Sequence, residues 1–120
     1  MNQLSNGNKR YDLEERTYEF ALAVCLYCKK LPKTISNIEY VKQVIRSSGA
    51  PASNYIEANE SLGKKDFQMR IKICRKESKE TYLWLRLIIN TNPDKFRQEG
   101  LLLMQEANEL KKIFSSILNK

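Results

Sequence analysis

Residues 64–91 read KKDFQMRIKICRKESKETYLWLRLIINT, and this stretch decides the fold. Residues suited to burial recur in it at alternating steps of four and three, which is the spacing of a helix in a bundle. These residues are Phe67, Ile71, Cys74, Ser78, Thr81, Leu85 and Ile88. At 1.5 Å per residue the helix is about 40 Å long. Its last part, Tyr82 to Ile89, is apolar around the helix, so we expect it to be buried on every side.

Two helices are predicted before this stretch, with Pro32 between them. The first begins with Asp12 as its N-cap, and its inward residues lie three and four apart. They are Leu13, Thr17, Phe20, Val24, Tyr27 and Leu31. The second begins near Ser36 or Asn37. Its expected inward residues are Ile38, Val41, Val44 and Ile45. Residues 49–51, Gly-Ala-Pro, must kink or interrupt it, because proline lacks the backbone donor and clashes with the preceding turn.

One helix is predicted after it, with Pro93 in its first turn and Asn92 as its cap. Its expected inward residues follow Gly100. They are Leu102, Met104, Leu110, Ile113, Phe114, Ile117 and Leu118. Four amphipathic helices with short links predict a single all-α domain, an antiparallel up-down four-helix bundle with a kinked second helix. We place the bundle at residues 12–119, after a disordered N-terminal tail at residues 1–11.

Composition excludes several classes of protein. The 120 residues are enough for one domain with a real core, and they contain no histidine, which excludes histidine-based catalysis and His-ligated zinc. No apolar run is long enough for a membrane span, and the polar start from Met1 to Arg10 lacks a signal peptide. We expect a cytoplasmic protein with reduced cysteines, no metal and no cofactor. Cys25 and Cys28 form a CxxC pair within a helix, and we interpret them as core packing.

The positive charge is concentrated in the third predicted helix. The net charge is +7, and residues 64–86 hold 8 basic and 3 acidic side chains. Lys65, Lys72, Lys79 and Arg86 are seven apart and therefore line one helix face, which Arg75 and Lys76 widen. This pattern indicates a polyanion partner, most commonly nucleic acid, and a merely solvated helix face is the equal alternative on charge alone. It shows no aromatic interleaving and no helix-turn-helix signature, so sequence-specific recognition is not indicated.

A second set of polar residues lies beside apolar positions of the second and third helices. In the second helix these are Arg46, Asn54 (or Ser53) and Glu57, and in the third they are Glu77 and Glu80. A half-buried arginine needs a carboxylate partner, because an unpaired buried charge is very costly. We therefore predict that Arg46 pairs with Glu77, Glu80 or Glu57, in a network that fixes the register of the helices. Acid/base catalysis by these carboxylates is the competing interpretation, and the sequence offers no evidence of a pocket for it.

Several blocks of the sequence resemble a known family. They are ERTYEFA at 15–21, VIRSSGAPASNYIEA at 44–58, Asp66-Phe67, Ile71-Lys72-Ile73, Lys76-Glu77, Glu80-Thr81 and Trp84-Leu85-Arg86-Leu87. In this order they resemble the four-helix-bundle proteins encoded in intervening sequences of bacterial large-subunit ribosomal RNA genes. The resemblance implies a cytoplasmic bundle without catalytic activity, whose relatives assemble into five-fold rings. A similar fold serves as a basic pentameric accessory protein that binds RNA and the reverse transcriptase of diversity-generating retroelements.

Together these observations predict a protein that is not an enzyme. Surplus apolar surface at Tyr82–Ile89 and Leu101–Met104 predicts a homo-oligomer, and the resemblance implies that it is a pentamer. We expect an accessory protein that binds RNA or DNA without sequence specificity through the basic face, with a reverse transcriptase as a further partner implied by the resemblance. The alternative is a protein-interaction scaffold in which nucleic acid has no role.

Overall fold

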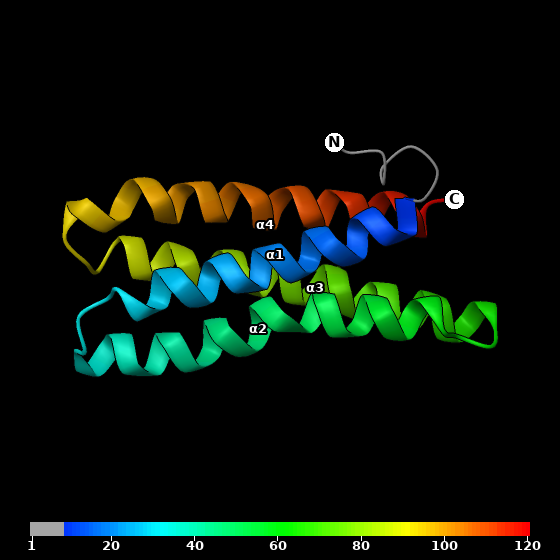
Figure 1. Ribbon diagram of the computed structural model, residues 1–120, viewed down its shortest axis with the longest axis horizontal. Coiled ribbons are helices and arrows are strands. Elements are labelled where there is room, and N and C mark those ends of the chain that lie inside the picture. The colour runs from blue at the N-terminus through cyan, green and yellow to red at the C-terminus, as the bar shows by residue number, and fades with distance from the viewer. Residues whose placement is uncertain (1–8) are drawn as a thin grey trace.

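The bundle predicted from the sequence is confirmed. A computed structural model describes residues 9–120, and their side chains from Leu13 onward. Four helices follow one another: α1 (Lys9–Lys29), α2 (Ile35–Asn59), α3 (Lys64–Ile89) and α4 (Arg97–Leu118), with a short 3-10 helix, η2 (Asp94–Phe96), before α4. Short links make neighbouring helices antiparallel (Figure 1). α3 packs along its length against both α2 and α4, and α1 closes the bundle by contacting the same two helices.

The first helix begins earlier than predicted. α1 starts at Lys9, so Asp12 lies within its first turn and is not its N-cap. Residues 9–11, which the sequence assigns to the tail, are helical, and the rest of that tail, residues 1–8, lies outside the described residues. An acidic residue in a first turn still favours the helix through the macrodipole. The predicted inward stripe from Leu13 to Leu31 is buried, as expected.

α2 passes through its proline as one helix. The side chain of Thr34 caps it by accepting from the Asn37 backbone N–H (3.1 Å), and the helix begins at Ile35, close to the predicted start near Ser36 or Asn37. Pro51 lies inside the helix, whose axis changes direction midway (Figure 1). Proline therefore bends this helix without interrupting it. Because α2 holds Pro51 buried against α3, the carbonyl of Pro51 accepts from the Cys74 thiol (3.5 Å).

The buried face of α2 differs from the predicted one. Val44 is buried and Val41 is partly buried, but Ile38 and Ile45 are exposed. Most of the buried side chains of α2 are small or polar. They are Asn37, Ser47, Ser48, Pro51 and Ala58, together with Val44 and Tyr55. Small residues allow two helix backbones to approach closely, which a search for large apolar residues cannot detect.

α3 has the predicted seam on its inner side and an open outer side. All of the seam residues are buried except Phe67, which packs partly buried against the core. The expectation that Tyr82–Ile89 is buried on every side is wrong, because Tyr82 is 39% exposed and Leu83 47% exposed. Among the described helices, α2 and α4 are the ones that pack along α3, and neither covers these two side chains.

The link between α3 and α4 also differs from the prediction. Pro93 precedes η2, and the Asn92 side chain does not cap α4. Instead, the side-chain amides of Asn37 and Asn92 donate to each other (2.7 and 2.9 Å), which joins the start of α2 to this link. In α4, Met104, Leu110 and Phe114 are buried and three further predicted residues pack partly buried, whereas Leu102 is exposed.

Three helices meet at Gly100. The Tyr27 side chain of α1 is fully buried, and its hydroxyl donates to the Phe96 carbonyl (2.8 Å). A Cβ atom at Gly100 would collide with the Ile89 side chain and would lie 2.7 Å from the Tyr27 hydroxyl oxygen. Only glycine allows α4 to pass this close to α1 and α3.

Candidate nucleic-acid interface

The six predicted basic residues lie on the side of α3 that faces away from the core. Lys65, Lys72, Lys76, Lys79 and Arg86 are exposed, and Arg75 is half-buried. Seam residues such as Ile71 and Cys74 occupy the opposite side, where the helix is covered. The 3.6-residue period of the helix places cations seven residues apart on one face, so the stripe is on the surface of the folded chain.

The cations of this face form no ion pair with any carboxylate whose side chain the structure describes. Between residues 13 and 120, the basic partners of ion pairs are Arg16, Lys30, Lys42, Arg46 and Lys112. None of them belongs to the six-residue face. Unpaired exposed cations that share one face are the arrangement that attracts phosphates and releases their counterions.

The exposed end of α3 adds an aromatic ring to the basic face. A shallow hollow of about 460 Å³ is lined by Lys76, Lys79, Glu80, Tyr82, Leu83 and Arg86. The expectation that the stripe lacks aromatic interleaving is therefore wrong. Helical spacing could have revealed it, because Tyr82 lies three residues after Lys79 and four before Arg86, and such residues are neighbours on a helix surface.

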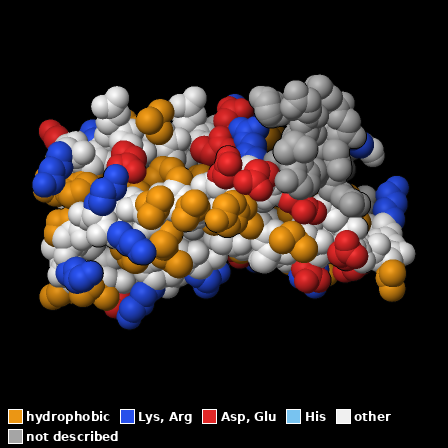
Figure 2. All heavy atoms as spheres, in the orientation of Figure 1, with side chains coloured by type: hydrophobic (Ala, Val, Ile, Leu, Met, Phe, Trp, Pro, Cys, Tyr) orange, Lys and Arg blue, Asp and Glu red, His pale blue; other side chains and the backbone are white. Residues whose placement is uncertain are grey.

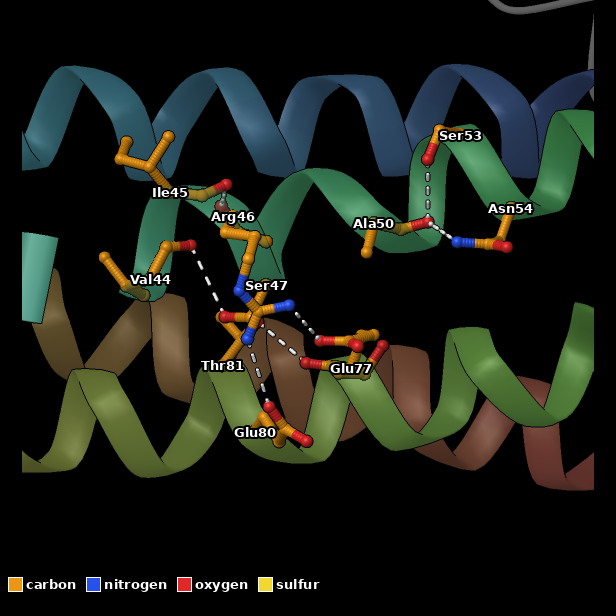
Figure 3. A network of polar contacts seen from close by, with 12 residues as sticks. Val44, Ile45, Arg46, Ser47, Ala50, Ser53, Asn54, Glu77, Glu80 and Thr81 are labelled. Atoms are coloured by element: carbon orange, nitrogen blue, oxygen red, sulfur yellow. Dashed lines mark hydrogen bonds and ion pairs between the residues drawn. The ribbon is translucent and has the colours of Figure 1, made fainter. Parts of the chain in front are cut away.

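Arg46 joins α2 to α3 through two carboxylates (Figure 3). Its Nη1 lies 3.5 Å from Glu77 Oε1 and its Nη2 lies 3.4 Å from Glu80 Oε1. The predicted pairing of Arg46 with a carboxylate of the third helix is therefore present. The side chain of Glu77 is only 10% exposed, whereas that of Arg46 is 56% exposed. The guanidinium thus reaches inward from the surface to a nearly buried carboxylate.

A buried hydroxyl pair continues this network into the core. The side chains of Ser47 on α2 and Thr81 on α3 share a hydrogen bond of 2.8 Å (Figure 3). Thr81 Oγ1 also lies 2.8 Å from the Glu77 carbonyl oxygen, one turn earlier in its own helix. Because these hydroxyls are buried, each needs a partner, and only one register of α2 against α3 supplies it.

Two predicted members of the network do not contact Arg46. Asn54 Nδ2 donates to the Ala50 carbonyl (3.0 Å), and its Oδ1 accepts from Arg70 Nη1 (3.0 Å). Asn54 therefore joins α2 to α3 separately, through an arginine that sequence reasoning counted only as part of a basic run. Glu57 is exposed and is not part of the network, because it lies eleven residues after Arg46, about 16 Å farther along the helix at 1.5 Å per residue.

The cysteines are packed as the sequence predicts. Cys28 and Cys74 are buried, Cys25 is partly buried, and all three are free thiols. Burial in apolar surroundings raises the pKa of the Cys28 thiol and that of Cys74 to about 12 each. A thiol with such a pKa is a poor metal ligand and nucleophile at neutral pH. Across the described part of the chain, no three acidic or cysteine side chains gather closely enough to hold a metal ion.

None of the four helices between residues 9 and 120 combines the length and the apolarity that a membrane crossing needs.

The comparison with known proteins agrees with the bundle. A protein of unknown function from the S23 ribosomal protein family of Bacteroides thetaiotaomicron has a solved structure that matches with a TM-score of 0.82. The two are 26% identical, and the match covers 93% of this chain and 99% of the other.

Sequence comparison identifies the family. No curated protein matches the chain. A family model described as 23S rRNA-intervening sequence protein matches residues 9–116, which include all four helices almost completely. The chain belongs to the 23S rRNA-intervening sequence protein family.

Proposed function

We propose that this protein is a non-catalytic, homo-oligomeric accessory protein of the cytoplasm that binds RNA or DNA without sequence specificity. The outer face of α3 is the binding surface. Its contacting residues are Lys65, Lys72, Arg75, Lys76, Lys79 and Arg86. The observation that carries the proposal is that these cations share one side of a rigid helix and have no acidic partner in the described chain.

Self-association would turn a weak site into a useful one. One stripe neutralises few phosphates, but several stripes on one assembly bind the same strand with a high effective concentration. Exposed apolar side chains favour an assembly: Leu101 and Leu102 on α4, and a band over α1 and α2 (Figure 2). In that band α1 exposes Tyr18, Leu22 and Leu26, and α2 exposes Ile38 and Ile45. A pentamer is the assembly that the family resemblance implies, and light scattering of the 14.1 kDa chain measures it.

The same apolar band favours a second candidate function. A protein-interaction scaffold needs an exposed apolar surface for its partner, and the outer sides of α1 and α2 offer one. The partner that the family resemblance implies is a reverse transcriptase. In this alternative the basic face of α3 is solvated and binds no nucleic acid.

The two functions are distinguished by fluorescence anisotropy with labelled RNA and DNA 20-mers at low salt. Reversing Lys72 and Lys79 to glutamate should weaken binding to every sequence at least tenfold, because two cations become two repulsive charges. Both residues are exposed on the outer side of α3, so the fold should remain intact.

Reversal of the exposed Lys29 and Lys33 is the matched control, because it makes the same change in net charge away from α3. Equal losses from both double variants would mean that only net charge matters. Absence of binding to RNA and DNA at low salt, with the oligomer intact, would leave the scaffold as the function.

A further inference from the structure

We propose that the hollow around Tyr82 is a base-stacking site, so that this surface prefers single-stranded nucleic acid to duplex. The inference rests on the proposed function and names the class of ligand. The ring of Tyr82 is exposed among unpaired cations at the end of α3. The sequence pattern predicts that this segment is fully buried.

The ring lies between two cations along the helix. Lys79 precedes Tyr82 by three residues and Arg86 follows it by four, and both line the same hollow. A phosphate on either side of a nucleotide could therefore meet a cation while its base lies against the ring. Basic residues that follow the backbone, with aromatic rings for the bases, are the combination found where proteins bind single strands.

The rest of the hollow suits a base more than a phosphate. Leu83 is 47% exposed and forms an apolar surface beside Tyr82. An apolar side chain cannot bind phosphate, but it can cover the face of a base. Bases of a duplex are already stacked on each other, and unstacking one step costs a few kcal/mol. A ring on a straight helix is therefore accessible to an unpaired base only.

Glu80 is the one acidic residue that lines the hollow, and Arg46 compensates part of its charge while it also pairs with Glu77. Arg46 Nη2 lies 3.4 Å from Glu80 Oε1 (Figure 3). The guanidinium reaches this carboxylate from α2, so the rim keeps the positive sign that Lys76, Lys79 and Arg86 provide. The network between α2 and α3 therefore also keeps the hollow suitable for an anionic strand.

The test compares Tyr82→Ala with Tyr82→Phe. Anisotropy is measured with labelled single-stranded RNA, single-stranded DNA and a duplex of the same sequence at one salt concentration. Tyr82→Ala should weaken binding of both single strands about tenfold and leave the duplex unchanged, because only the stacking partner is lost. Tyr82→Phe keeps the ring and should bind like the unchanged chain. Met69→Ala removes an exposed apolar side chain of α3 outside the hollow and is the matched control.

Four outcomes would overturn the stacking site. The unchanged protein could bind single strands and duplex equally, or Tyr82→Ala could lose affinity equally for both. Tyr82→Phe could lose as much affinity as Tyr82→Ala, or Tyr82→Ala could change the assembled mass. The last would make the ring part of a subunit interface. Each of these four outcomes is compatible with phosphate binding by α3. The proposed function fails by a different result, which is that no nucleic acid binds at low salt.

Discussion

α1 and α3 fill similar positions in the bundle but present opposite chemistry to solvent. Both bury a stripe of residues spaced three and four apart, and both contact α2 and α4. Outward, α3 presents six cations, of which none is paired in the described chain, whereas α1 presents Tyr18, Leu22 and Leu26. The inner faces are interchangeable solutions to making a core. The outer faces differ, because that of α3 is cationic and that of α1 is apolar.

A polar network supports one of these faces and not the other. Arg46, Ser47 and Asn54 of α2 all contact α3. α1 is linked to its neighbours by the buried hydrogen bond from the Tyr27 hydroxyl to the Phe96 carbonyl (2.8 Å) and by partly exposed ion pairs such as that between Arg16 and Glu106 (2.7 Å). Exposed ion pairs contribute about 0–1 kcal/mol, whereas buried hydroxyl pairs specify one register. The polar side chains of α2 therefore specify the register of α3, the helix that carries the basic face.

The largest expected effect comes from breaking the junction that α1 and α3 share. Gly100→Ala places a Cβ atom against the Ile89 side chain of α3 and the Tyr27 hydroxyl of α1. Overpacking of this kind costs about 1–3 kcal/mol, and we expect the upper end because both neighbours are buried. Urea unfolding measures the free energy. Gly49→Ala is the control, because no atom lies within 4 Å of its added Cβ, and a similar loss there would contradict the account.

The next effect is alkaline destabilisation, to which both helices contribute. Burial raises the pKa of Tyr27 and Cys28 on α1, and that of Cys74 on α3, to about 12. Each group is thus kept neutral in the folded chain. For the two thiols, whose usual pKa is 9.0, the stabilisation is fully present below pH 9 and is lost as the pH rises toward 12.

Urea unfolding at each pH should show that the free energy of unfolding falls between pH 8 and pH 10, by about 1 kcal/mol for each thiol. Cys28→Ala and Cys74→Ala should each lower this pH dependence by about half, which compares α1 with α3 directly. A midpoint that stays constant from pH 8 to pH 10 would show that the thiols are not held neutral.

A smaller effect is expected from the network that supports only α3. Arg46→Met and Glu77→Gln should couple by about 1 kcal/mol in a double-mutant cycle of unfolding. A fully buried pair would lose about 3–5 kcal/mol on removal of one member, but the guanidinium is more than half exposed, and solvent screens it. Glu57→Gln in place of Glu77→Gln is the control, and it should add to Arg46→Met without coupling. Additivity of the Glu77 cycle would mean that the pair contributes nothing.

The sequence predicts the burial and pairing of a residue well where the residue type itself determines them. The seam of α3 follows from helical periodicity, and the pairing of Arg46 follows from the cost of an unpaired charge. Prediction from the sequence failed where a neighbouring element decides. Ser47 is buried because α3 approaches closely, and Tyr82 is exposed because none of the helices between residues 9 and 120 lies over it. Periodicity shows which residues share a face but does not show what covers that face.

The same limit applies to the candidate site. Four of the six cations of α3 are identified by their seven-residue spacing and the other two by their place beside this row, since lysine and arginine side chains are mostly exposed. The hollow and its ring are not, because their exposure depends on which two of the other three helices pack against α3. The sequence predicts Asn54 in the network of Arg46, but it bonds Arg70 instead, and that partner depends on the register between α2 and α3.

The most direct test of the account is the salt dependence of nucleic-acid binding by the oligomer. The slope of log affinity against log salt counts the phosphates that the protein neutralises, at about 0.7–0.9 for each phosphate. Changing Lys72 and Lys79 to glutamine should reduce this slope by about 1.4–1.8 for each stripe that contacts the strand, while the same change at Lys29 and Lys33 should leave it unaltered. An unaltered slope after loss of Lys72 and Lys79 would contradict the assignment of the outer face of α3 as the binding surface.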